Sequence, residues 1–133
     1  MADILMSLEA SSRRSFPRIA IKTKGRILFI SPADVLAVEA KGNYVLLQRQ
    51  SGSHFVHESI SAMTDHLRAY GFVRIHRSVL VNSLFVEEIQ PCPTGEYLVR
   101  IKGGKEYTAT RTYRQNFKSL AEFWIGTSAF LSE

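Results

Sequence analysis

The chain has 133 residues, of which 45% are hydrophobic and 22% are charged, a composition typical of one globular domain with a buried core. It contains no run of about 18 apolar residues, which excludes a membrane-spanning helix. The first residues include Asp3 and Glu9 and lack the basic start and apolar core of a secretory signal. We therefore expect a cytoplasmic protein that contacts no membrane. The formal net charge of +5 favours an anionic partner.

The first part of the chain reads as short strands separated by turn residues. We expect residues 1–17 to form a tail or linker, with a helical piece over residues 2–10. Turn-forming pairs such as Lys24-Gly25, Gly42-Asn43 and Ser51-Gly52 separate alternating apolar segments. The expected strands are residues 18–23, 26–30, 35–40, 44–48 and 54–58.

Two helical segments are expected between these strands and the next ones. Ser31 precedes Pro32 in a pattern typical of a single capped helical turn. Further on, Ser59 or Ser61 can cap a helix that Gly71 ends. The apolar residues of this second helix, which predict that it covers a sheet, are Ile60, Met63, Leu67 and Tyr70.

The C-terminal part predicts more strands and a final helix. Strands are expected over residues 86–90, 96–102 and 105–110, with Gly103-Gly104 joining the last two as a hairpin. A helix then begins near Arg111 or Thr112, with an apolar face formed by Tyr113, Phe117, Leu120 and Trp124. Its N-terminus adds a partial positive charge beside Arg111 that favours a phosphate. The segment from Arg100 to Lys118 holds six Lys or Arg residues and one acid, Glu106.

Residues 72–82, FVRIHRSVLVN, are the most informative stretch. An extended backbone places Arg74, His76 and Ser78 on one face, and the apolar residues that follow anchor these polar groups to a core. A basic loop held by a buried strand is suited to present cations to a phosphate backbone.

This stretch resembles the signature of the LytTR DNA-binding domain, the output module of many bacterial response regulators. Residues 38–45, VEAKGNYV, are similar to the strand, turn and strand that precede the signature in that family. Residues 107–113, YTATRTY, are similar to the segment that holds a base-contacting arginine. The resemblance implies a mainly β, elongated LytTR-type β-sheet domain with two short helices over residues 18–124. Residues 125–133 would then be a C-terminal tail.

The resemblance also implies how the domain binds DNA. Family members place loops at strand ends in successive major grooves, with a central loop over the minor groove between them. Arg111 is expected to read a base, because its guanidinium can donate two hydrogen bonds to guanine. The other major groove is expected to receive Lys41, Asn43 and Tyr44. The remaining expected DNA-binding residues are Arg77 at the central position, Arg74 and Ser78 on phosphates, His76 and Arg114.

The expected partner is double-stranded DNA with paired repeat sites, bound by two copies of a bacterial transcriptional regulator. Val79 departs from the family pattern, in which an aromatic residue is frequent at this position, and Thr110 stands where serine is frequent. Residues 1–17 are too few for a receiver domain ahead of the LytTR-like part. We therefore expect either that an upstream domain has been removed or that a separate regulatory protein controls the domain.

Several of these residues also have a purely structural interpretation. Asn43 suits a turn that needs a left-handed backbone, and Tyr44 can be half buried in the sheet. Arg74 can be an ordinary strand charge, and His76 a hydrogen-bonded structural histidine. Asn82 is expected to cap or turn the backbone after the strand.

Other classes of function have less support in the sequence. His54 and His57 are three residues apart, which on a strand points them to opposite faces and disfavours a metal site. The lone Cys92 cannot form an intramolecular disulfide. We expect no catalytic residue, no metal and no cofactor.

The alternative is a β-rich protein-interaction or RNA-binding module. RNA modules stack bases on exposed aromatic residues, whereas Phe55, Phe72 and Phe85 lie mostly in apolar registers that indicate a core.

Overall fold

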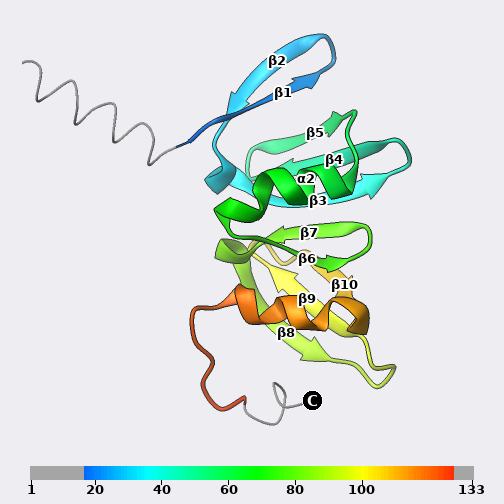
Figure 1. The fold of residues 1–133 in the computed structure, drawn as a ribbon, viewed down its shortest axis with the longest axis vertical. Helices are drawn as coiled ribbons and strands as arrows, with labels where there is room; N and C mark the ends of the chain where they lie inside the picture. Colours follow the sequence, from blue (N-terminus) through cyan, green and yellow to red (C-terminus); the bar gives the residue numbers. More distant parts are fainter. Residues whose placement is uncertain (1–16, 128–133) are drawn as a thin grey trace, which may run out of the picture.

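The computed structural model describes residues 17–127, and in this part the chain is mainly β, as predicted (Figure 1). The helical piece expected over residues 2–10 lies outside the described residues. The strands are β1 (Ile19–Thr23), β2 (Arg26–Ile30), β3 (Val35–Lys41), β4 (Tyr44–Arg49), β5 (Gly52–Val56), β6 (Phe72–His76), β7 (Val79–Asn82), β8 (Val86–Pro91), β9 (Tyr97–Ile101) and β10 (Glu106–Ala109). The helical elements are α2 (Ile60–Leu67), the short 3-10 turns η1 (Pro32–Asp34), η2 (Arg68–Tyr70) and η3 (Ser83–Phe85), and the longer 3-10 helix η4 (Arg111–Leu120).

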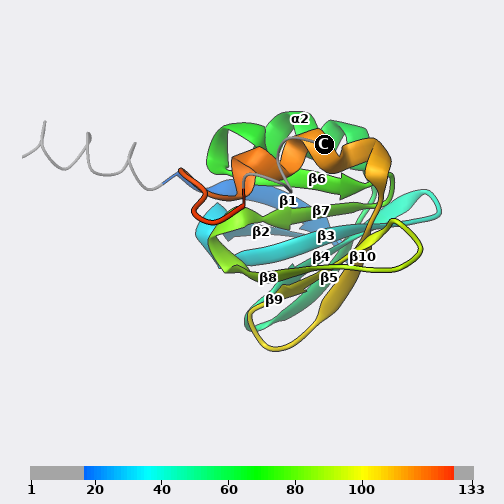
Figure 2. The same ribbon diagram turned by 90° about the horizontal axis from the view of Figure 1, so that it is seen from below.

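The strands form three antiparallel sheets that follow one another along the long axis of the molecule (Figure 1). The first is the β1-β2 hairpin, the second has the order β5-β4-β3-β7-β6, and the third has the order β10-β9-β8. Helices α2 and η4 lie on the same side of the strands (Figure 2). The fold is therefore an elongated column of hairpins with two helices along one side.

Strand alternation divides the core between the two faces of the five-stranded sheet. Val38 and Leu80 are paired across β3 and β7 and pack with Met63 and Leu67 of α2. Their neighbours on the same strands belong to a second cluster, formed with strands β8 to β10 and with the fully buried Phe117 of η4. Because successive side chains on a strand point to opposite faces, both faces of this sheet are buried at β3 and β7.

The helix caps predicted from the sequence are present in the structure. The Ser59 hydroxyl accepts a hydrogen bond from the Ala62 N–H at 3.0 Å at the start of α2. Gly71 ends the following turn with a left-handed φ of 85°, a conformation that glycine adopts without a steric penalty. Ser31 caps η1 by accepting from the Ala33 N–H at 3.2 Å.

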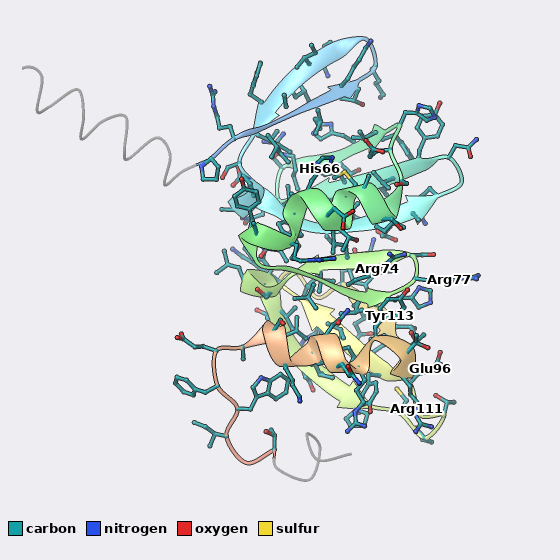
Figure 3. All side chains as sticks on the ribbon, viewed as in Figure 1. His66, Arg74, Arg77, Glu96, Arg111 and Tyr113 are labelled. Carbon is teal, nitrogen blue, oxygen red and sulfur yellow. The ribbon has the colours of Figure 1, made fainter. Side chains whose placement is uncertain are left out.

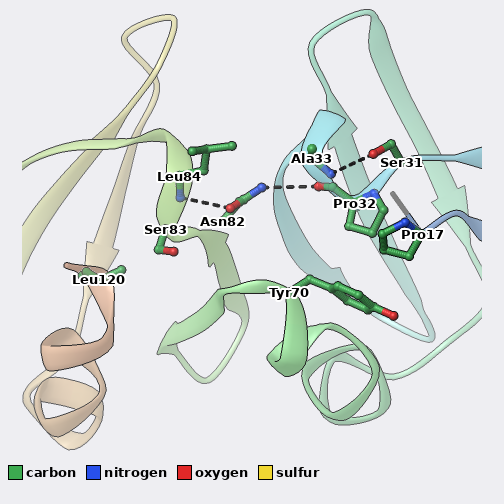
Figure 4. A pocket seen from close by; sticks show the side chains of 9 residues that line it. All are labelled: Pro17, Ser31, Pro32, Ala33, Tyr70, Asn82, Ser83, Leu84 and Leu120. Carbon is green, nitrogen blue, oxygen red and sulfur yellow. Dashed lines mark hydrogen bonds between the residues drawn. The ribbon is translucent and has the colours of Figure 1, made fainter. Parts of the chain in front are cut away.

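Asn82 joins two parts of the fold that are far apart in sequence, and it caps η3 as expected. Its side chain is 3% exposed and donates to the carbonyls of Pro32 at 3.3 Å and Val35 at 2.9 Å. Its amide oxygen accepts from the Leu84 N–H at 3.0 Å. Figure 4 shows Asn82 between η1 and η3, beside a hollow of about 600 Å³.

Two expectations from the sequence are wrong. Residues 72–82 do not form one extended strand, because β6 and β7 pair as a hairpin around Arg77-Ser78, so the alternation of Arg74, His76 and Ser78 on a single face does not apply. Phe55 is 52% exposed, whereas Phe72 and Phe85 are buried as expected. Phe55 pairs with Leu46 and lies on the face of β4 and β5 opposite to the fully buried Val45 and Leu47.

Candidate nucleic-acid interface

Three basic turns lie at the same edge of the molecule. Strands β3 and β7 are antiparallel neighbours, so the β3–β4 turn and the β6–β7 turn leave the sheet on the same side. The Ala40 N–H donates to the Ser78 carbonyl at 2.8 Å and joins these two turns. The Thr110 N–H donates to the Ile75 carbonyl at 3.0 Å and brings the start of η4 to the same place. The three turns therefore form a column on the right of Figure 1.

The β3–β4 turn exposes its polar side chains. Lys41, Asn43 and Tyr44 are all exposed. The positive φ of this turn belongs to Gly42, at 62°, and not to Asn43, so a left-handed backbone does not explain why asparagine stands at this position. The Tyr44 side chain is 48% exposed, and its ring lies 5.0 Å from the ring of His57.

The β6–β7 turn combines one outward-pointing cation with side chains that hold the backbone. Arg77 is exposed and points away from the body of the molecule (Figure 3). The Ser78 N–H donates to Nδ1 of His76 at 3.0 Å. Nδ1 is therefore unprotonated in this arrangement, and Nε2 is the ring nitrogen that can contact a partner. His76 stabilises the turn through Nδ1, and no hydrogen bond joins Nε2 to another residue between positions 17 and 127.

Arg74 is occupied by contacts within the protein. Its Nε donates to the carbonyl of His76 at 3.3 Å, and another guanidinium nitrogen donates to the carbonyl of Arg77. The guanidinium also lies 5.5 Å from the centre of the Tyr113 ring, a distance at which a cation is attracted to the face of the ring. Asn116 donates to the Arg74 carbonyl at 2.9 Å. Arg74 therefore connects the β6–β7 turn to η4.

The pairing of β6 with β7 shifts register between Arg74 and His76, next to this connection. Such a bulge leaves one residue out of the ladder and redirects its backbone groups, and here the freed carbonyl of Ile75 receives the Thr110 N–H.

Arg111 is exposed at the first position of η4 and lies against the β8–β9 turn. A Cβ placed on Gly95, whose φ is +89°, would come within 3.2 Å of Cδ of Arg111. The backbone of Gly95 therefore forms part of the surface that the Arg111 side chain contacts, and Figure 3 shows Arg111 beside the neighbouring Glu96. Arg114 follows one turn later and is half-buried.

Glu39 is a polar connection between the two larger sheets, close to the β3–β4 turn. Its carboxylate accepts hydrogen bonds from Gln48, from Nζ of Lys105 at 3.2 Å and from the Tyr107 hydroxyl at 3.3 Å. Nζ of Lys41 lies 3.7 Å from Oε1 of Glu39. Burial raises the pKa of Glu39, but the hydrogen bonds from Gln48 and Lys105 and the charges of Lys105 and Lys41 outweigh burial, so the pKa is lowered overall. Burial and the Glu39 charge raise the pKa of Tyr107.

The sequence interpretation did not identify Glu39, Gly95, Tyr113 or Asn116 as part of this edge. One signal was available, because Glu39 is an acid inside the apolar strand VLAVEAK, and a buried charge needs partners. The other three act through contacts between residues that are distant in sequence, which carry no local signal. Among residues 17–127, no three His, Cys, Asp or Glu side chains are grouped as a metal site would require, and no helix is long and apolar enough to cross a membrane.

Comparison with known proteins places the chain in a family. Residues 25–122 match the family model of the LytTr DNA-binding domain. The sensory transduction protein LytT of Bacillus subtilis is 24% identical over 116 residues, which are 87% of this chain and 48% of the relative. The positive alginate biosynthesis regulatory protein of Pseudomonas aeruginosa is 32% identical over 107 residues, which are 77% of this chain and 43% of the relative.

A solved structure has the same fold. The LytTr DNA-binding domain of a response regulator from Bacillus cereus superposes with a TM-score of 0.69 at 22% identity, covering 80% of this chain and 97% of the solved one. This likeness shows the fold, and it agrees with the mainly β architecture. The chain spans about half the length of the curated relatives it matches. With most of its length matched by the family model, the chain belongs to the LytTr DNA-binding domain family.

Proposed function

We propose that this chain binds specific double-stranded DNA through the turns at the strand ends and thereby regulates transcription. The observation that carries the proposal is the alignment of three basic turns on one edge, fixed by the bonds from Ala40 to Ser78 and from Thr110 to Ile75. A rigid scaffold that holds exposed loops is a common way to build a recognition surface. The family, whose description names DNA binding, supports the same ligand.

Each turn takes a distinct role in this proposal. Arg111 reads a base from the major groove, because an arginine can donate two hydrogen bonds to guanine O6 and N7. Lys41, Asn43 and Tyr44 enter the next major groove. Arg77 occupies the minor groove between them, since it is exposed at the central turn and points away from the body of the molecule (Figure 3).

Arg74 has two tasks in this proposal. Its hydrogen bonds to the His76 and Arg77 carbonyls hold the conformation of the turn, and its positive charge attracts a phosphate group of the DNA. Ser78, His76 and Arg114 complete the backbone contacts, which set position and not sequence preference.

We also propose that the DNA-binding domain comprises residues 18–124, that two copies occupy paired repeats, and that control comes from another domain or protein. The family match to residues 25–122 supports this extent of the domain.

Selection of bound duplexes from a random pool at about 150 mM salt tests the proposal, because this salt concentration suppresses purely electrostatic binding. Recovery of a paired motif with half-sites about one helical turn apart is the expected result. A pool that stays random, with all retention lost as salt rises, would exclude sequence-specific binding. Competition with single-stranded RNA tests the alternative, because an RNA module would prefer the single strand.

Variants then test the roles of the two arginines. Arg111→Ala is expected to reduce affinity by about 1–3 kcal/mol and to flatten the preference at one base position. Arg74→Ala is expected to weaken binding to all sequences by a similar factor. Arg68→Ala is the matched control, because Arg68 is exposed at the far end of α2. Equal losses on every sequence for both Arg111→Ala and Arg74→Ala would contradict this division of roles.

A further inference from the structure

The β1–β2 hairpin concentrates positive charge. Between Pro17 and Ala33 the sequence contains the cations Arg18, Lys22, Lys24 and Arg26 and no acid. All four side chains are exposed. Lys22, Lys24 and Arg26 lie at or next to the turn, since Lys22 pairs with Ile27 and Thr23 pairs with Arg26. Within residues 17–127, no ion pair involves these three residues.

The turn of this hairpin lies at the same edge as the three basic turns. Lys22, Lys24 and Gly25 line a hollow of about 610 Å³ together with Tyr44 of the β3–β4 turn and His57 after β5. In Figure 1 the tip of the hairpin is at the top of the molecule, on the side where the other turns leave the sheets. The hairpin therefore extends the column of turns beyond Tyr44.

The electrostatics of the neighbouring strand agree with this placement. Burial, together with the positive charges of Arg49, Arg26 and Lys24, lowers the pKa of His54 on β5. His57 and His66 also border the hollow, and its one carboxylate is Glu58. The net charge facing the hollow is therefore positive.

The backbone holds the central cation outward. Lys24 has a φ of 50° and is the one non-glycine residue between residues 17 and 127 with a positive φ, a conformation that a side chain such as lysine adopts at some cost in energy. In a two-residue turn this conformation matches the twist of the flanking strands, so Lys24 is exposed at the tip of a regular hairpin.

We propose that the β1–β2 hairpin is an additional contact with the phosphate backbone of DNA, flanking the base-reading turns on the side of Tyr44. The inference rests on the proposed function. Lys22, Lys24 and Arg26 neutralise phosphates just outside the recognised sequence. Such contacts increase affinity and its dependence on salt, and they leave sequence preference unchanged.

The experiment compares two triple variants with equal loss of charge. The test variant is Lys22→Gln, Lys24→Gln and Arg26→Gln. The control variant is Arg68→Gln, Lys102→Gln and Lys118→Gln. The control residues are exposed on the opposite edge: Lys102 lies beside Phe85 after β7, and Arg68 and Lys118 lie near the C-terminal ends of α2 and η4. Binding to the duplex selected above is measured by fluorescence anisotropy over a series of salt concentrations.

The logarithm of the binding constant falls linearly with the logarithm of the salt concentration. Removing one cation that neutralises a phosphate makes this slope less steep by about 0.9. The test variant is expected to reduce the magnitude of the slope by about 2–3 for each bound copy and to bind at least about tenfold more weakly at low salt, with the selected motif unchanged. The control variant is expected to change both quantities much less. Shortening the DNA flank on one side of the site should weaken the wild type and the control variant but not the test variant.

The outcomes separate this inference from the proposed function. If the wild type selects a motif but the test and control variants have the same slope and the same flank dependence, the hairpin does not contact DNA. If the wild type selects no duplex, the proposed function itself fails. If the triple variant does not fold, the double variant Lys22→Gln and Arg26→Gln provides the same comparison, because it leaves the turn residue Lys24 in place. Its salt dependence should be less steep than that of the wild type by about 2 for each bound copy.

Discussion

Glu39→Ala tests whether the polar connection between the two larger sheets stabilises the fold. The Glu39 side chain is 14% exposed, and the Tyr107 residue that donates to it is 6% exposed. Removing the carboxylate leaves the Tyr107 hydroxyl without this acceptor, which costs about 1–3 kcal/mol for a buried group. The two lysines are about half exposed, at 52% for Lys41 and 48% for Lys105, so each pair contributes about 0.2–1 kcal/mol.

The sum predicts a loss of about 1.5–5 kcal/mol in the free energy of unfolding. Urea denaturation measures this loss directly, and a thermal scan should show a fall in Tm of about 4 °C or more for each kcal/mol. Glu88→Ala is the control, because Glu88 forms an exposed pair with Arg100 at 3.0 Å and should lose no more than about 1 kcal/mol. If the two variants were equally stable, Glu39 would be an ordinary surface charge.

The charge of Glu39 also predicts a dependence on pH. The hydrogen bonds and lysines that surround Glu39 lower its pKa below the ordinary value of 4.5, so the folded state favours the ionised carboxylate. The stabilisation is therefore fully present above the unfolded pKa and is lost as the pH falls through the folded pKa. The wild type should be more stable than Glu39→Gln at pH 7, and this difference should shrink steadily below about pH 4.5. A difference that stayed constant down to pH 2 would show that the charge contributes nothing.

Two further substitutions test contacts seen in the structure. Asn82→Ala removes three hydrogen bonds of a buried side chain. At about 1 kcal/mol for each bond, the free energy of unfolding should fall by about 2–4 kcal/mol. A loss under about 0.5 kcal/mol in urea denaturation would contradict this account of the role of Asn82. Gly95→Ala adds a Cβ 3.2 Å from Cδ of Arg111 at a φ of +89°, so it should shift Arg111 and weaken binding to the selected duplex. Gly103→Ala controls for backbone strain, because Gly103 has a φ of +91° and open space where its Cβ would lie. Equal affinities of the two variants for the duplex would refute the proposed shift of Arg111.

Features that depend on nearby residues could be read from the sequence. The turn at Lys24-Gly25, the caps at Ser31 and Ser59 and the stop at Gly71 all follow from the preferences of a few adjacent residues, and the structure contains each of them.

Features that depend on sheet order could not be read in this way. Placing Glu39 against Tyr107 joins residues 68 positions apart, and no local pattern indicates that β3 pairs with β7 or that β10 ends beside β6. The bulge in β6 was missed for the same reason. The bulge is defined by the ladder between β6 and β7, and this ladder exists only because the chain turns back at Arg77-Ser78.

The contacts at the edge separate residues that hold the turns from residues that are exposed to a ligand. Arg74, Asn116 and Glu39 are engaged within the protein, whereas Asn43, Arg77 and Arg111 are exposed at three successive turns. Because the backbone bonds from Ala40 and Thr110 fix the spacing of these turns, the exposed side chains can differ without altering the distances between them. Under the proposed function, substitutions at the tips of the turns would change the contacts with bases, while the sheets beneath would keep the spacing of the turns.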